Sequence, residues 1–213
     1  MPNIDVAQLF IAFLVLLFSL TIHESSHAWV ASRLGDPTAK LLGRVSLNPI
    51  VHADPVGTLL FPLIAFVTHL PLIGWAKPVP INPRYFTHPK RDQVMVAAAG
   101  PASNLALAIA AAFLLRRMPF TTGTLGDLDV SGPLATIADQ TVDINVLLAV
   151  FNMIPVPPLD GGNVLAGILP GRLAAGFNYL RPYGFLIIYA LMLTGALGYL
   201  VAPTYYLLLS WLR

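Results

Sequence analysis

The chain has 213 residues, of which 56% are hydrophobic and only 10% are charged, and its mean hydropathy is +0.74. This composition excludes an ordinary soluble globule and is typical of a polytopic membrane protein, here one membrane domain over 1–213. The net charge of +2 is small and the basic residues form no continuous patch, so we expect no nucleic-acid partner. The absence of cysteine excludes disulfides and thiolate metal ligands.

The first apolar run, 6–31, ends at the Gly- and Pro-bearing segment 33–37. No basic segment precedes this run and no small-residue cleavage site follows it, so we expect a retained membrane span rather than a signal peptide. Near its C-terminal end lie His23, Glu24 and His27. An ionisable group in hydrocarbon is costly, by about 2.5–3.5 kcal/mol for a central acid on insertion scales, which makes a functional site the default interpretation.

The spacing of these three residues indicates a metal site. On a helix, residues four apart share one face, so His23 and His27 can both direct an imidazole at one ion. Glu24 is turned by about 100° from His23, and it is therefore free to act as a general base without being a ligand. This is the H-E-x-x-H arrangement of zinc hydrolases. The alternative is a helix end whose polar residues face a bundle interior or the membrane interface.

The middle of the chain alternates between apolar runs and breaks. Segment 40–51 is mixed and tolerates β structure. A second apolar run, 56–73, leads into segment 74–83, whose prolines forbid a helix and favour an extended chain. A further span is expected over 93–115, opening with the small residues 97–103 that permit close helix packing.

The last part of the chain contains two more apolar runs. After an expected loop over 116–140, the run 141–165 is broken at the Pro- and Gly-rich segment 155–162. The final run, 183–212, is longer than one bilayer crossing of about 30 Å requires, and only Pro203 interrupts it. It is either one long kinked helix or a span followed by an interfacial piece. The domain core is then about 6–165, with 183–213 as a C-terminal hydrophobic segment.

Asp160 is the second informative position, because a carboxylate at membrane depth beside prolines and glycines is something a passive span would avoid. Catalytic zinc normally takes three protein ligands and keeps a fourth position open. His23, His27 and Asp160 supply that number without a cysteine. The alternative is an ordinary interfacial loop with a solvated aspartate.

These motifs together resemble the site-2 protease family of zinc intramembrane metalloproteases, peptidase family M50. The resemblance rests on the H-E-S-S-H of 23–27 and on the N-M-I-P-V-P-P-L-D-G-G of 152–162, and segment 99–101 resembles the opening of the span between them. It covers about 6–165 and, without a PDZ-like or CBS-like domain, is similar to the minimal core of the family. The Ser25–Ser26 pair differs from the bulkier apolar residues of many members and leaves the ligands unchanged.

The resemblance implies one zinc ion per chain with ligands His23, His27 and Asp160, and Glu24 as the catalytic base. Asn152 would lie near the site and contact the substrate backbone or the oxyanion. The implied reaction is endopeptidase cleavage within or near a transmembrane segment of a membrane-protein substrate, as in regulated intramembrane proteolysis. The alternative is a non-proteolytic zinc-binding membrane protein, either a metal carrier, for which no internal repeat is found, or an inactive regulator, which Glu24 disfavours.

The positions of the motifs constrain the topology. Both motifs lie near the C-terminal ends of their spans, so these spans must run in the same direction for the motifs to meet. With one span between them, the chain over 33–92 must begin and end on one side, and the run 56–73 is either re-entrant or followed by a return through the membrane. We therefore expect segment 74–81 to be an extended, re-entrant element beside the zinc site. Its candidate substrate-binding residues are Gly74, Trp75 and Ala76.

We thus expect an all-α polytopic fold of about four to six transmembrane segments around a buried zinc site, with a small β or re-entrant element. Seven basic residues lie within 33–92 and two more precede Tyr183, and the positive-inside rule makes this face cytoplasmic. The zinc site would then lie nearer the cytoplasmic face of a multi-pass cell-membrane protein. Its expected partners are the lipid bilayer and a transmembrane substrate, and the sequence indicates no oligomeric state.

Other polar residues receive lesser roles. His52 and Asp54 could form a pair outside the ligand shell, but a solvated or capping role is the more common one for such residues. We assign no role to His69 and His88. Asn104, on the small-residue face of its span, is expected to hydrogen-bond between helices rather than to touch substrate.

Overall fold

The computed structural model of the protein describes residues 6–61, 64, 74–117, 124–125, 128–129 and 131–213. Its α-helices are α1 (Val6–Arg33), α2 (Thr38–Leu41), α3 (Pro49–His52), α5 (Pro89–Arg117), α6 (Ser131–Asn152), α7 (Asp160–Ile168), α8 (Gly171–Asn178), α9 (Gly184–Leu193) and α10 (Ala196–Leu212). A π-helical turn, η1 (Pro55–Leu60), and two 3₁₀ turns, η2 (Pro83–Tyr85) and η3 (Arg181–Tyr183), accompany them. Two strands, β1 (Thr124–Leu125) and β2 (Leu128–Asp129), pair antiparallel.

Three of these helices, α1, α5 and α6, are long and apolar enough to cross a membrane. The stretch 171–193 and α10 pass the same test together but meet at a bend of 82°, so the described residues supply three spans, or four if the bent pair is one. Three spans fall below the expected range of about four to six, and four would be its lower end. With the apolar composition, this number of spans makes the chain a multi-pass membrane protein.

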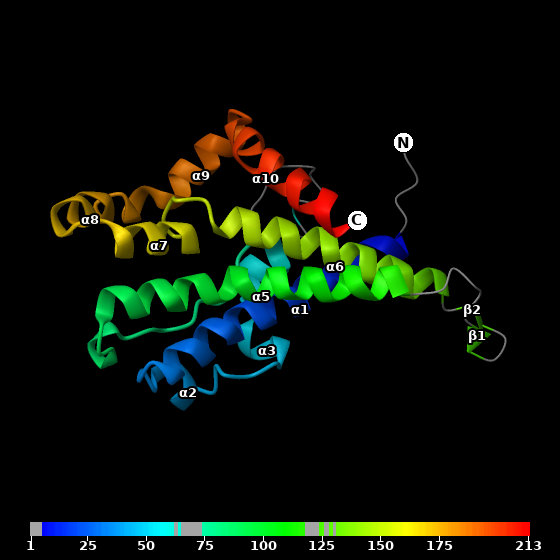
Figure 1. The fold of residues 1–213 in the computed structure, drawn as a ribbon, viewed down its shortest axis with the longest axis horizontal. Coiled ribbons are helices and arrows are strands. Elements are labelled where there is room, and N and C mark those ends of the chain that lie inside the picture. Colours follow the sequence, from blue (N-terminus) through cyan, green and yellow to red (C-terminus); the bar gives the residue numbers. More distant parts are fainter. Residues whose placement is uncertain (1–5, 62–63, 65–73, 118–123, 126–127, 130) are drawn as a thin grey trace.

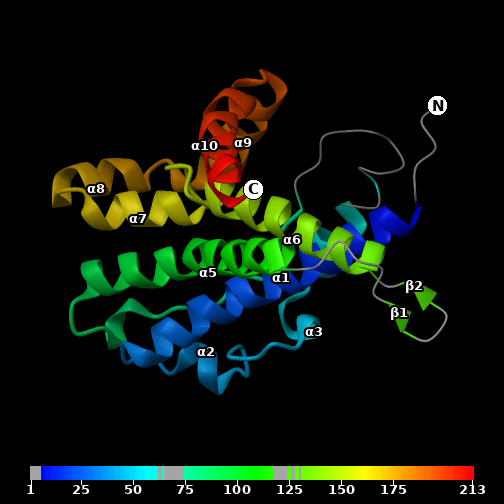
Figure 2. The ribbon, with the colours of Figure 1, turned by 45° about the vertical axis from the view of Figure 1, so that its right-hand side comes forward.

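The three long helices lie side by side and form the centre of the molecule (Figures 1 and 2). Helices α1 and α6 run in the same direction and α5 runs between them in the opposite one, as the positions of the two motifs require. Helices α7 and α8 lie on one side of this layer, and α2 and α3 lie on the other, against α1. The site is therefore enclosed between the long helices and the N-terminus of α7.

Small residues on α5 allow α6 to pack closely against it. Without a hydrophobic driving force between helices in lipid, close van der Waals contact between small and branched side chains holds such helices together. The buried core of this interface consists of Ala108, Ala111, Ala112, Val142, Val146, Val150 and Ile154, with Val201 and Leu209 added from α10. These alanines lie beyond the small residues 97–103 on which the expectation of close packing rested, and of the latter Ala97, Gly100 and Pro101 are also buried.

Segment 40–51, whose composition tolerates β structure, is fully described and contains the end of α2, a turn and most of α3. The reason is local helix-start chemistry. The side chain of Asn48 accepts a hydrogen bond from the Ile50 N–H, and Pro49 occupies the first helical position, where it has no N–H to leave unpaired. These signals outweigh the β propensity of the neighbouring side chains, and the described strands, β1 and β2, lie elsewhere.

Two boundaries also differ from expectation. Helix α6 begins at Ser131 rather than near Thr141, so it includes the last part of the expected loop. The final apolar run breaks at Gly195, whose φ of +75° is left-handed, and Pro203 lies inside α10. Glycine adopts this φ without steric cost and so ends α9 there. Beyond η1, most of the run 56–73 lies outside the described residues, so the prediction that this run is re-entrant stays a prediction.

Candidate metal centre

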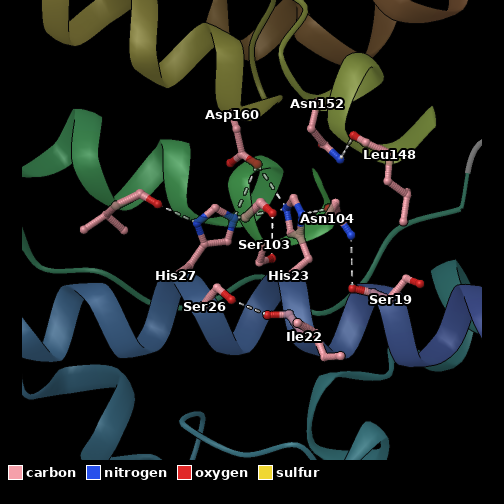
Figure 3. Close-up of polar contacts among 12 residues, drawn as sticks. Ser19, Ile22, His23, Ser26, His27, Ser103, Asn104, Leu148, Asn152 and Asp160 are labelled. Carbon is pink, nitrogen blue, oxygen red and sulfur yellow. Dashed lines mark hydrogen bonds and ion pairs between the residues drawn. The ribbon is translucent and has the colours of Figure 1, made fainter. Parts of the chain in front are cut away.

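The three predicted ligands meet at one point (Figure 3). Nε2 of His23 and Nε2 of His27 lie 3.0 Å and 3.3 Å from Oδ2 of Asp160, and the two nitrogens lie 3.1 Å from each other. Tetrahedral zinc with ligand bonds of about 2.0–2.1 Å holds its ligand atoms about 3.3 Å apart. The three atoms therefore have nearly the spacing of one face of a zinc coordination tetrahedron.

Helix α1 supplies both imidazoles. His23 and His27 lie one turn apart on its buried face, and their rings meet edge to face at an interplanar angle of 84°. Glu24 is half-buried and lines the cavity that His23 and His27 also line. The H-E-x-x-H spacing thus predicts the local arrangement correctly, because a single helix determines it.

Asp160 reaches the histidines from the first turn of α7, where the helix dipole favours a negative charge. Two glycines after it allow this approach. A Cβ on Gly161 would lie 2.2 Å from the Met153 carbonyl oxygen, and one on Gly162 would lie 2.7 Å from the Pro157 nitrogen. The chain after α6 therefore folds back directly onto the start of α7, and this contact places the carboxylate above α1.

Each histidine has a carbonyl oxygen behind it. Nδ1 of His23 lies 2.6 Å from Oδ1 of Asn104, and Nδ1 of His27 lies 2.7 Å from the Val96 carbonyl oxygen. A carbonyl oxygen only accepts hydrogen bonds, so both Nδ1 atoms carry the proton and both Nε2 atoms present a lone pair to Asp160. Such partners fix the orientation and tautomer of metal-ligating histidines.

Asn104 belongs to a buried network that joins the three long helices. Its amide nitrogen donates to Oδ1 of Asn145 (2.8 Å), and the Asn145 amide donates to Oγ of Ser19 (2.9 Å). Both asparagines are fully buried, at 0% exposure. Asn104 thus hydrogen-bonds between helices as expected. Sequence reasoning missed its second role, the orientation of His23, because only the packed structure shows which side chain stands behind Nδ1.

The site fits a divalent cation. Two imidazole lone pairs and a carboxylate oxygen repel one another when nothing positive lies between them, yet here they converge. Oδ2 of Asp160 is buried and accepts no hydrogen bond from the residues that the structure describes. Two neutral imidazoles and one carboxylate form a ligand set typical of catalytic zinc.

A cavity of about 530 Å³ opens beside the three ligand atoms. Every predicted substrate-contacting residue lines it, namely Asn152, Gly74, Trp75 and Ala76, and Glu24 lies on the same wall. Asn152 donates one of its two amide hydrogens to the Leu148 carbonyl oxygen (3.0 Å), which holds the side chain in place. Most of the remaining wall is apolar, with Leu20, Phe151, Phe185 and Ile188 among its residues.

The other candidate polar residues lie away from this centre. His52 is buried rather than solvated. Its Nε2 donates to the Ser46 carbonyl oxygen (2.8 Å), and burial lowers the pKa of its imidazole. Asp54 caps η1, where it accepts from the N–H groups of Val56 and Gly57. These bonds are separate, so the structure does not bring His52 and Asp54 together as a pair; His69 lies outside the described residues.

Comparison with known proteins gives a consistent result. The family model described as "Peptidase family M50" matches residues 11–143 of this chain. "Putative zinc metalloprotease YwhC" of Bacillus subtilis (strain 168) is 37% identical over 194 residues, which cover 89% of this chain and 83% of that protein. "Putative zinc metalloprotease Rip2" of Mycolicibacterium smegmatis is 30% identical over 191 residues, covering 85% of this chain and 66% of that protein. No solved structure matches the chain significantly.

A first prediction concerns Gly100 on α5, which faces the ligands. A Cβ at this position would lie 2.5 Å from Nε2 of His23 and from Nε2 of His27, so Gly100→Ala must displace at least one imidazole. We expect zinc affinity, measured by competition with a chromogenic chelator, to fall by about 10-fold or more. Gly198→Ala is the control, because a Cβ there meets nothing within 4 Å. Equal zinc affinity in the two variants would contradict the described packing.

A second prediction concerns Asn104. Asn104→Leu removes the acceptor behind His23, so we expect metal affinity to fall by about 10- to 100-fold, as for other partners of ligating histidines. Asn104→Asp keeps an acceptor for the Nδ1 proton and should retain more metal than the leucine variant. The measurement is the zinc content of purified protein after dialysis against a weak chelator. Identical retention in the two variants would show that His23 does not depend on this acceptor.

Proposed function

The chain belongs to peptidase family M50, and from this premise we propose that it is a zinc-dependent intramembrane endopeptidase. Its substrate is a membrane protein, cleaved within or near a transmembrane segment, as in regulated intramembrane proteolysis. One observation carries this proposal: the atoms of His23, His27 and Asp160 converge beside Glu24 on the wall of a cavity inside a bundle of apolar helices. One zinc ion per chain, held by these three residues, would polarise the scissile carbonyl and lower the pKa of a water molecule toward neutrality.

Glu24 is the general base in this proposal. It lies on the cavity wall next to a ligand but is not among the three residues whose ligand atoms converge, so its carboxylate is free to take a proton from the attacking water. It can then deliver that proton to the leaving amine. The apolar wall around it keeps bulk water away and strengthens each electrostatic interaction in the cavity.

Asn152 is proposed to stabilise the developing oxyanion. Its amide nitrogen has two hydrogens, and the bond to the Leu148 carbonyl oxygen uses one of them. The second hydrogen remains to donate to a substrate oxygen in the cavity that Asn152 lines. Because the first bond already fixes the side chain, little reorientation is needed at the moment of reaction.

Segment 74–81 is proposed to bind the substrate backbone. A helical substrate hides its carbonyl oxygens in hydrogen bonds, so it must unwind before cleavage, and pairing with an exposed backbone edge replaces the bonds that it loses. Gly74, Trp75 and Ala76 line the cavity beside the ligands, as this role requires. The basic residues within 33–92 support a position of this face, and of the metal centre with it, nearer the cytoplasm.

The test of the general base is Glu24→Gln. This variant keeps the shape of the side chain but loses the proton acceptor, so we expect cleavage of a single-span substrate to fall by about 100-fold or more while zinc content is unchanged. The assay uses detergent-purified protein with and without chelator. Normal cleavage by the variant would remove Glu24 from this role. Zinc binding without chelator-sensitive cleavage in the wild type would favour the non-proteolytic alternative.

The third ligand has a separate test. Asp160→Ala removes one of three donor atoms, and we expect zinc retention after dialysis to fall well below that of the wild type. Asp139→Ala serves as a control, because Asp139 is an exposed carboxylate that pairs with Arg213 away from the site. A zinc content of Asp160→Ala equal to that of the control would exclude Asp160 from the ligand set.

A further inference from the structure

The backbone segment 74–82 lines the cavity, and one of its edges is bonded to the chain before it. The N–H of Trp75 donates to the Gly57 carbonyl oxygen (3.2 Å), and the N–H of Lys77 donates to the His52 carbonyl oxygen (2.8 Å). Bonding by every second residue is the pattern of an extended strand, in which the residue between faces the other way. Ala76 therefore directs its peptide groups away from this bonded edge, on the side where the cavity lies.

Two buried charges hold the rest of the segment. Oδ2 of Asp36 accepts a hydrogen bond from the Asn82 N–H (2.7 Å). The guanidinium of Arg44 donates to the carbonyl oxygens of Lys77 and Pro78, the latter at 3.0 Å. Asp36 is 0% exposed and Arg44 is 5% exposed, and neither forms an ion pair with any residue that the structure describes.

A turn of the same type precedes each of the two charged residues. Gly35, with φ of +106°, follows the end of α1, and the N–H of Asp36 donates to the carbonyl oxygen five residues earlier (3.0 Å). Gly43, with φ of +69°, follows the end of α2, and the N–H of Arg44 likewise donates to the carbonyl oxygen five residues earlier (2.8 Å). Both are Schellman turns, in which a left-handed glycine reverses the chain over the helix end. The residue after each glycine is thereby buried.

A buried ionised group is unfavourable unless its hydrogen-bonding capacity is met, and bonds to a charged partner are the strong ones. Asp36 and Arg44 both direct such bonds to one backbone segment, at two separate points along it. Between and beside these points, Ala76 and Val79 line the cavity, and their peptide groups bond to no other residue within the described parts of the chain. The segment is therefore fixed in place with part of its hydrogen-bonding edge free.

Resting on the proposed function, we propose that Asp36 and Arg44 are positioning residues for substrate. They hold segment 74–82 so that the free peptide groups of Ala76 face the cavity and accept an unwound, extended stretch of a transmembrane substrate as an added strand. Neither charged side chain touches the substrate. Their effect is on where the substrate backbone lies, so it should appear in substrate binding and not in metal binding.

The first test is Arg44→Gln, which removes the charge and the fork of donors whose Nη1 arm bonds to the Val51 carbonyl oxygen and whose Nη2 arm bonds to those of Lys77 and Pro78. With a single-span substrate that the wild type cleaves, we expect KM to rise by about 10-fold, with kcat less affected and zinc content unchanged. Arg44→Lys keeps the charge without the fork and should give an intermediate KM, which also covers the case in which the glutamine variant does not fold. Arg84→Gln is the matched control, because Arg84 is exposed near the same segment.

The second test measures how close the substrate backbone lies to segment 74–82 without catalytic turnover. The chain has no cysteine, so Ala76→Cys introduces a unique thiol, and in the Glu24→Gln background the substrate stays intact. With an added mild oxidant to accept the two electrons, we expect a disulfide to form with a substrate that carries one cysteine beside the bond that the wild type cleaves, and its yield to fall several-fold when Arg44→Gln or Asp36→Asn is added.

If the Arg44 and Asp36 variants had the same KM and the same cross-linking yield as the wild type, the positioning role would be overturned. A loss of zinc in parallel with activity would also overturn it, because the residues would then support the metal centre instead. Failure of the proposed function looks different, since in that case the wild type itself would cleave no membrane substrate.

Discussion

The mutual repulsion of three electron-rich atoms is the constraint that shapes this protein. Two imidazole nitrogens and one carboxylate oxygen lie within 3.3 Å of each other, and such a group is stable only when a cation lies among them and when the chain prevents them from moving apart. Gly100 leaves the space that the rings occupy, and the glycines after Asp160 let α7 approach α1. Much of the interior of the described helices serves to hold these atoms together.

The apolar surroundings of the bundle fix the relative position of its helices. An unpaired amide or hydroxyl is unfavourable there, and the hydrogen bonds that link Ser19, Asn145, Asn104 and His23 in series are all made in one relative position of α1, α5 and α6. A shift of any of these helices would break at least one bond in it. The orientation of the His23 ring is thus tied to the packing of α1, α5 and α6.

The sequence predicted the parts of the site that local geometry determines. The structure brings together His23 and His27, which the sequence singled out by their spacing on one helix, and Asp160, which it singled out by the charge cost of its surroundings; their role as metal ligands stays a prediction. The long helices followed from apolar runs. The sequence alone predicted the break at Pro203, because proline disrupts helices. In the structure Pro203 lies inside α10, and the chain bends instead at the left-handed Gly195.

Long-range contacts were beyond the sequence for a physical reason. Nothing in the pattern around Asn104 says that its oxygen faces His23, and nothing near Arg44 names the carbonyl oxygens that it binds. The sequence does contain one local pattern that predicts these turns. In Leu-Gly-Asp at 34–36 and in Leu-Gly-Arg at 42–44, a charged residue directly follows a glycine at the end of a helix. Such a pattern predicts a charged residue turned back over a helix end.

X-ray absorption spectroscopy of zinc in the purified wild-type protein tests the central claim most directly. The account predicts about one zinc per chain, with scattering from two imidazole rings and bonds to nitrogen and oxygen of about 2.0–2.1 Å. Zinc without an imidazole signal, or a purified and folded protein that takes up no zinc, would contradict it.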